Sequence, residues 1–338
     1  MTRPTDVPET DPAGEVRRAL EASLYQCKRV VVGQDAMLER LLVALLTGGH
    51  VLIEGVPGLA KTLTVRTLAT VLGGSFGRVQ FTPDLVPADL VGTRIWQPGD
   101  GTFRTELGPV FANLLLADEI NRAPAKVQSA LLEVMQEHQV TIGGESFRVP
   151  EPFLVMATQN PIESEGTYDL PEAQVDRFLF KLVVDYPEVE DEIAVVDRIS
   201  VETPRAHRAV DIEDLVGYQQ TAREVFAERS VLAYAVALVD ATRHPARYGL
   251  ADLEPLIQFG ASPRASLGLV QSARALALLR GRTHVVPHDV RDLAADVLRH
   301  RLVLSYDALA DRVAPDDLVE RILAAVEPAR PVRLAEAA

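Results

Sequence analysis

The sequence predicts an α/β domain built on a mostly parallel sheet, followed by an all-helical domain. Short apolar segments with the pattern of buried strands alternate with amphipathic segments, which favours a parallel sheet covered on both faces. A glycine-rich loop joins the first of these strands to a helix. From Glu188 onward only helical periodicity is clear. We therefore expect a disordered tail over 1–15, an α/β core over 16–186 and a helical lid domain over 187–330.

Each element of the core has a local reason in the sequence. Leucines at helical spacing predict one or two helices over 16–47, and Gly48-Gly49 would end the last of them. Further helices are expected from Lys61 to about Leu72 and over 124–137, and alternating residues about Gly143-Gly144 predict a β-hairpin. Five apolar segments predict a five-stranded parallel sheet: VLIEG (51–55), RVQFT (78–82), ANLLLADEI (112–120), FLVMATQN (153–160) and FLFKLVVD (178–185).

The second domain is predicted as a series of amphipathic helices with no confident strand. Four acidic residues between Glu188 and Glu192 suit the first turn of its first helix, where the helix dipole favours negative charge. The helices are expected near 188–201, 211–227, 230–243, 263–280, 287–300 and 316–326.

Composition excludes several classes of protein. The chain of 338 residues has 34 Lys and Arg against 48 Asp and Glu, a formal net charge of −14, which makes nucleic acid an unlikely partner. Cys27 is the one cysteine and no segment resembles a signal peptide, so we expect a cytoplasmic protein. The apolar run near Leu41–Leu46 is far shorter than the roughly 20 residues that span a bilayer, so no membrane insertion is expected.

The glycine-rich loop carries the strongest functional signal. Its residues, continued by Leu63, are Gly55, Val56, Pro57, Gly58, Leu59, Ala60, Lys61 and Thr62. They fit the loop that binds nucleotide phosphates, except that Ala60 stands where glycine is usual. Backbone N–H groups and the start of the following helix would bind phosphate, Lys61 would add a positive charge, and the Thr62 hydroxyl would bind Mg²⁺. The sequence therefore predicts a nucleotide and Mg²⁺ as ligands.

Polar residues follow two further predicted strands. The carboxyl ends of parallel strands form the crevice where α/β sheets bind ligands. There Asp118 would hold Mg²⁺ through water, and Glu119 would polarise the attacking water as general base. The alternative is a strand that simply ends in two solvated acids. Asn160, at the end of the next strand, would either orient the water against the γ-phosphate or cap the chain before Pro161.

Two arginines are further candidates. Arg177, just ahead of the last predicted strand, is either a surface cation or the extra positive charge that many NTPases place on the transferred phosphoryl group, often from a neighbouring subunit. Ser262-Pro263 would begin a helix, which places Arg264 in its first turn, against an unfavourable dipole. Bound nucleotide would relieve this, and so would a local acid such as Glu254.

In this order the segments resemble the MoxR family of AAA+ ATPases, in the group whose second core helix carries a hairpin insert. The resemblance covers about residues 30 to 305, and alanine before the loop lysine is usual in that family. The matching segments are GVPGLAKT (55–62), QFTPDLVPADLVG (80–92), GPVFANLLLADEINRAPAKVQSALLEVMQE (108–137), the QVTIGG hairpin (139–144), FLVMATQNPIESEGTYDLPEAQVDRFLFK (153–181) and GASPRAS (260–266).

The resemblance implies a role for each matching residue. Asn121 and Arg122 belong to the family motif and would connect Glu119 to the subunit boundary. The resemblance also implies a ring, commonly a hexamer, that hydrolyses ATP with Mg²⁺ as a chaperone-like remodeller, with a von Willebrand factor A domain protein as partner. The implied roles are Walker A for Lys61 and Thr62, Walker B for Asp118 and Glu119, sensor 1 for Asn160, sensor 2 for Arg264 and a trans-acting arginine finger for Arg177.

Three alternatives stay open at this point. One is a motor subunit resembling that of magnesium chelatase, which shares the hairpin insert. The second is a nucleotide-gated scaffold with slow turnover, against which the intact Glu119 and Asn160 argue. The third is a DNA-linked motor, since DEINRA also resembles restriction-associated GTPases, and the net charge of −14 disfavours it.

Overall fold

The structure is a computed structural model, which describes residues 12–56, 58–160, 166–201 and 204–328. Most of the expected tail therefore lies outside the described residues, and its last residues form the start of helix α1 (Pro12–Val30). Within the described residues, no helix combines the length and the apolar character needed to cross a membrane.

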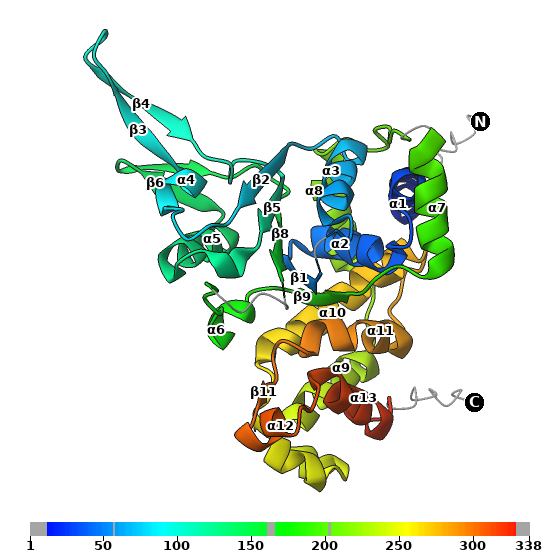
Figure 1. Cartoon of the computed structure of the whole chain (residues 1–338). Coiled ribbons are helices and arrows are strands. Elements are labelled where there is room, and N and C mark those ends of the chain that lie inside the picture. The colour runs from blue at the N-terminus through cyan, green and yellow to red at the C-terminus, as the bar shows by residue number, and fades with distance from the viewer. Residues whose placement is uncertain (1–11, 57, 161–165, 202–203, 329–338) are drawn as a thin grey trace, which may run out of the picture.

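The predicted five-stranded parallel sheet is confirmed, and its strand order is β2-β5-β8-β1-β9 (Figure 1). All neighbouring strands in it run parallel. The central strands β5 and β8 are buried except at their carboxyl ends, because apolar side chains leave both faces of the sheet. The strands are β1 (Val51–Gly55), β2 (Phe76–Gln80), β5 (Leu114–Asp118), β8 (Leu154–Gln159) and β9 (Phe180–Val184).

Helices cover both faces of this sheet. Helix α5 (Ala125–Glu137) and the predicted hairpin, β6 (Gln139–Ile142) with β7 (Glu145–Arg148), pack against one face. Helices α2 (Asp35–Thr47) and α3 (Lys61–Val71) pack against the other, and α1 packs on α3 (Figure 1). Alternate residues of β1, β2, β5 and β8 enter two separate apolar clusters, as the period of two in a strand requires, whereas the edge strand β9 contributes to one of them.

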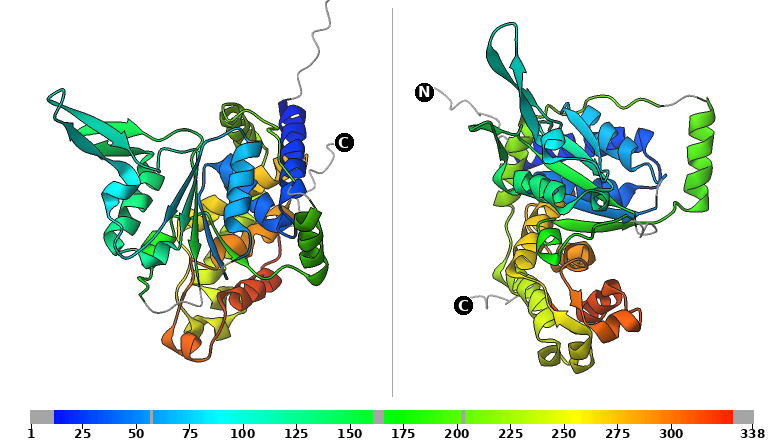
Figure 2. Two further views of the ribbon diagram at one scale, coloured as in Figure 1. Left: turned by 45° about the horizontal axis from the view of Figure 1, so that its top comes forward. Right: turned by 60° about the vertical axis from the view of Figure 1, so that its left-hand side comes forward.

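A second hairpin, which the sequence does not predict, extends from the core between β2 and β5. A short helix α4 (Pro87–Val91) leads into β3 (Gly92–Gln97), which pairs antiparallel with β4 (Thr102–Leu107). Its tip projects beyond the rest of the molecule in the views of Figures 1 and 2. Both of its faces are largely exposed, so its residues lack the alternation of apolar and polar side chains by which a half-buried strand is recognised.

The remainder is helical, as predicted, with one small addition. Strands β10 (Ile257–Phe259) and β11 (Val303–Leu304) form an antiparallel pair, which is too short to give a sequence pattern. Helix α7 stands away from the body (Figure 2). The helices are α7 (Val189–Val201), α8 (Asp214–Glu224), α9 (Arg229–Arg243), α10 (Pro263–Leu279), α11 (Pro287–Leu298), α12 (Tyr306–Ala310) and α13 (Pro315–Ala325). Short elements are α6 (Glu172–Val175) and the 3₁₀ segments Ile120–Arg122, Pro245–Tyr248 and Ala251–Leu256.

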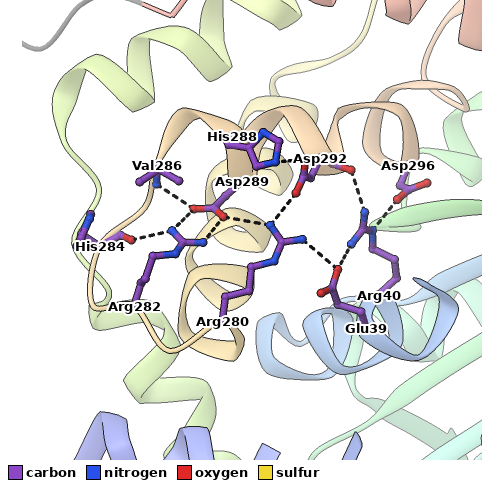
Figure 3. Close-up of polar contacts among 10 residues, drawn as sticks. All are labelled: Glu39, Arg40, Arg280, Arg282, His284, Val286, His288, Asp289, Asp292 and Asp296. Atoms are coloured by element: carbon purple, nitrogen blue, oxygen red, sulfur yellow. Dashed lines mark hydrogen bonds and ion pairs between the residues drawn. The ribbon is translucent and has the colours of Figure 1, made fainter. Parts of the chain in front are cut away.

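The lid is fastened to the core of the same chain. One apolar cluster runs from α2 and the sheet into α10 and α11. Beside it, a polar network joins α2 to the lid (Figure 3). Arg40 Nε donates to Asp296 at 2.7 Å, and Arg280 donates to Asp292 at 2.6 Å and to Glu39 at 3.4 Å. The core and the lid are thus packed against each other over both apolar and charged surfaces.

Candidate nucleotide-binding site

A cavity of about 500 Å³ lies at the carboxyl ends of β1, β5 and β8. This is the end of a parallel sheet at which α/β proteins bind ligands, because loops and helix N-termini converge there. Its lining brings together the glycine-rich loop, the two acids and the amide that the sequence singles out. The lining residues are Gly55, Gly58, Leu59, Ala60, Lys61, Thr62, Leu63, Arg78, Gln80, Asp118, Glu119, Thr158, Gln159 and Asn160.

The glycine-rich loop turns from β1 into α3 as predicted. Gly58 (φ 91°) and Ala60 (φ 55°) both have left-handed backbone conformations, so Ala60 takes a geometry that favours glycine. Lys61 Nζ donates to the Gly55 carbonyl at 2.5 Å, which keeps the ammonium at the mouth of the loop. Partial burial lowers the pKa of Lys61, an effect that Asp118 and other nearby acids oppose. The loop thus combines a helix N-terminus with a fixed cation, an arrangement suited to phosphate.

One residue of the predicted loop points away from the cavity, and another lies outside the described residues. Val56 packs against the apolar core and does not line the cavity. Pro57 lies outside the described residues.

The two acids at the end of β5 are held in different ways by Thr158. The Thr158 hydroxyl donates to Asp118 Oδ1 at 2.6 Å and accepts from the Glu119 backbone N–H at 2.9 Å. Glu119 has φ 56°, a conformation that favours glycine and that the hydrogen bond to Thr158 helps to hold. The Asp118 and Glu119 carboxylates therefore belong to adjacent residues at one strand end, where hydrogen bonds to Thr158 define the backbone.

The structure adds polar residues at the site that the sequence does not single out. On β2, Arg78 Nη2 donates to Asp118 Oδ2 at 2.8 Å, and Gln80 Nε2 donates to Glu119 Oε2 at 2.6 Å. The register of β2 against β5 places Gln80 opposite Asp118. Arg122, which belongs to the motif noted above, pairs with Glu119 Oε2 at 3.2 Å. The sequence predicts these contacts only in part, because the roles of Arg78 and Gln80 depend on β2 lying beside β5 in the sheet.

The oxygen donors in the cavity fit a magnesium ion. The Thr62 hydroxyl and the Asp118 carboxylate both line it, and hard oxygen ligands are those that Mg²⁺ prefers. Asn160 and Gln159, at the end of β8, line the same cavity, and Asn160 is buried.

Arg177 and Arg264 do not lie in this cavity. They line a separate hollow of about 280 Å³ beside the amino-terminal end of β1, together with Asp176 and Arg301. Arg264 Nη1 is 3.6 Å from Asp176 Oδ2, so its nearby acid is Asp176 and not Glu254. Ser262 caps α10 as predicted, accepting from the Arg264 backbone N–H at 3.2 Å. The sequence thus predicts the local geometry of Arg264 but not its place in the fold.

Comparison with known proteins agrees with this geometry. The model of the ATPase family associated with various cellular activities (AAA) matches residues 50–180, and an AAA lid domain model matches residues 251–322. A crystal structure of a candidate ATPase from Cytophaga hutchinsonii is 45% identical, covers 95% of this chain and 98% of that one, and superposes with a TM-score of 0.90.

Similarity to named proteins identifies the family within the AAA ATPases. "Chaperone MoxR1" of Mycobacterium tuberculosis is 57% identical over 314 residues, which are 93% of this chain and 83% of the relative. "Protein MoxR" of Paracoccus denitrificans is 36% identical, over 85% of this chain and 89% of the relative. Together with the sheet order, the glycine-rich loop and the acids at the end of β5, these similarities show that the chain belongs to the MoxR family of AAA+ ATPases.

Proposed function

We propose that this chain binds ATP and Mg²⁺ in the 500 Å³ cavity, hydrolyses the ATP, and uses the cycle to remodel or activate a protein partner. The observation that carries the proposal is the convergence of Lys61, Thr62, Asp118, Glu119 and Asn160 on one cavity from three strand ends. A phosphate-binding loop, a metal-binding carboxylate, a general base and an amide are the parts that phosphoryl transfer to water needs.

Each residue then has a defined task. Glu119 accepts a proton from the attacking water while the water oxygen bonds to the γ-phosphorus. The bond between the γ-phosphorus and the leaving ADP oxygen breaks. Asn160 orients that water. Lys61 and the N–H groups at the start of α3 stabilise the charge that spreads over the phosphoryl oxygens. Thr62 and Asp118 would hold Mg²⁺, which supplies further charge neutralisation when bound.

In the state described here, Glu119 and Asp118 are engaged by other side chains. Gln80 and Arg122 contact the Glu119 carboxylate, and Arg78 contacts Asp118. For Glu119 to act as base and Asp118 to bind a metal, these contacts must loosen. We therefore propose that the nucleotide-bound cavity differs from this one in the positions of Arg78 and Gln80.

We further propose that Arg177 and Arg264 serve a nucleotide bound to another copy of the chain. Among the described residues, none beyond Asn160 lines the cavity, so the lid supplies no cation to its own site. Both arginines are exposed. This arrangement supports a ring in which each interface completes one site, and we expect a hexamer.

The partner is expected to be a protein. The name of the Mycobacterium tuberculosis relative, a chaperone, supports this class of role. We propose a von Willebrand factor A domain protein as the partner and the cytoplasm as the location. A magnesium-chelatase-like motor is less well supported, since the relative named as a chelatase subunit homologue is only 26% identical.

The first test is the general base. Glu119→Gln should bind ATP with near wild-type affinity and lose hydrolysis by roughly a thousandfold, because the amide cannot take up a proton at neutral pH. Binding is measured with a fluorescent ATP analogue and turnover by phosphate release. Unchanged turnover would remove Glu119 from the mechanism, and slow turnover in the wild type would favour the scaffold.

The second test is the sharing of arginines between subunits. Arg177→Ala chains keep an intact cavity, and Glu119→Gln chains keep an intact Arg177. Each variant alone should be inactive, whereas an equimolar mixture should recover a substantial fraction of wild-type hydrolysis. If the mixture stays as inactive as its parts, Arg177 does not act on a neighbouring subunit.

A further inference from the structure

We infer that Arg301 is a positioning residue, which holds the segment carrying Arg177 in the conformation that presents Arg177 and Arg264 to the next subunit. The inference rests on the proposed sharing of these arginines between copies. Arg301 lies just beyond α11, far along the chain from Arg177, and its side chain is only 3% exposed. Its donors are used within its own chain, so we expect any effect of Arg301 on hydrolysis to pass through its neighbours.

Arg301 uses almost all of its donors on the segment next to Arg177. Its Nη2 donates to the Phe178 carbonyl at 2.6 Å and to the Asp176 carbonyl at 3.3 Å, and its Nη1 donates to the Leu179 carbonyl at 3.1 Å. A further contact from Nη1, to the Val297 carbonyl, anchors the guanidinium to α11. A planar group with several donors in fixed directions can define the path of a backbone in a way that a single ammonium cannot.

The carboxylate of Asp176 connects Arg301 to the second arginine. Asp176 accepts from Arg301 Nε at 2.8 Å and from the Ser262 hydroxyl at 3.0 Å, and Arg264 Nη1 lies 3.6 Å from it. Ser262 is also the N-cap of α10, the helix that carries Arg264. One buried guanidinium and one carboxylate thus fix the backbone beside both exposed arginines.

The neighbouring residues of the lid offer a matched control. Arg299 Nη1 donates to the Lys181 carbonyl at 2.6 Å and pairs with Asp296 and Asp316. Like Arg301 it joins the lid to a backbone carbonyl of the core, but its partner Lys181 lies on β9, and its hydrogen bonds reach neither Asp176 nor Phe178. A substitution at Arg299 therefore weakens the attachment of the lid without releasing the segment of Arg177.

The test uses mixtures of two kinds of chain and introduces Arg301→Lys into one kind at a time. Lysine keeps the positive charge beside Asp176 but cannot reproduce the array of contacts. Donor chains carry Glu119→Gln and supply Arg177, and acceptor chains carry Arg177→Ala and supply the cavity. We expect Arg301→Lys in the donor to lower the recovered hydrolysis on the order of 10- to 100-fold, as misplacing a catalytic group does. The same change in the acceptor should keep the recovered hydrolysis within about twofold of that of the mixture without it. The control, Arg299→Lys in the donor, should have an equally small effect.

The outcomes are distinguishable. Equal losses in donor and acceptor, or an equal loss with Arg299→Lys, would mean that Arg301 only stabilises the fold and would overturn the inference. No loss in the donor would overturn it as well. If Glu119→Gln chains fail to rescue Arg177→Ala chains at all, the proposed sharing is wrong and the role of Arg301 falls with it. Thermal unfolding and binding of a fluorescent ATP analogue, measured on each double variant, show whether the fold and the cavity are intact.

Discussion

At the scale of single residues, one hydroxyl contacts both acids of the site. Thr158 is buried, and its Oγ1 donates to Asp118 while accepting from the backbone of Glu119. A threonine at the end of a strand gives no signal of this kind in the sequence. Its role becomes visible only when β8 is known to lie beside β5.

Replacing Thr158 by the isosteric valine should therefore damage both stability and catalysis. The Glu119 N–H loses its acceptor in a partly buried position, which costs about 1–3 kcal/mol of unfolding free energy. The kcat for ATP should fall roughly tenfold or more, because the Glu119 carboxylate shifts. Urea denaturation and steady-state kinetics measure the two effects. Thr158→Ser keeps the hydroxyl and should stay close to wild type; a serine variant as impaired as valine would contradict this account.

Some residues of the site can be predicted from the local sequence, and others cannot. Lys61, Thr62, Asp118, Glu119 and Asn160 are predictable because each follows or ends a recognisable strand, and strand ends converge. Strand order and long-range packing supply the rest. Asp176, for example, takes the place expected for Glu254 as the acid near Arg264, although it is far from Arg264 along the chain.

At the scale of elements, the β3–β4 hairpin is a largely exposed part of the core. Trp96 and Phe103 form a cross-strand pair with ring centroids 5.0 Å apart, and both are at least half exposed. Its contact with the β6–β7 turn is a hydrogen bond of 3.1 Å from Arg94 to the Gly143 carbonyl. A two-stranded hairpin with so little buried surface is marginally stable on its own.

Trp96 is the single tryptophan, so its fluorescence reports on this hairpin. In a urea titration, the change in its emission should come at lower urea than the loss of helical circular dichroism, because the hairpin opens before the core. Phe103→Leu should move the fluorescence transition further down and leave the helical transition in place. Coincident transitions in both proteins would show that the hairpin unfolds with the core.

At the scale of the whole molecule, the core and lid behave as one structure in this conformation. The helices of core and lid are predictable from their periodicity. The contacts between core and lid are not predictable, since they join residues more than 200 positions apart in the chain. Asp289, whose side chain is fully buried, lies at the lid end of this network (Figure 3). It accepts from two nitrogens of Arg282 at 2.5 and 2.7 Å and from the Val286 backbone N–H at 2.9 Å.

Asp289→Ala should destabilise the chain by about 1–3 kcal/mol, because the partly buried Arg282 and the Val286 N–H lose their shared acceptor. The loss should appear in a single unfolding transition that includes the core. Arg321 and Asp252 form an ion pair of similar length, 2.5 Å, but on the surface, and Asp252→Ala should leave the Tm near that of the wild type. Two separated transitions in Asp289→Ala would show that core and lid unfold independently.

The attachment of the lid to β9 has a further consequence, for solubility. β9 is an edge strand of the sheet, and an edge strand with free backbone groups can pair with a strand of another molecule. Arg299 occupies the Lys181 carbonyl, and α11 packs against the strand. The same contacts that join the lid to the core thus block a route to β-aggregation, which matters for a chain expected to meet its own copies edge to edge in a ring.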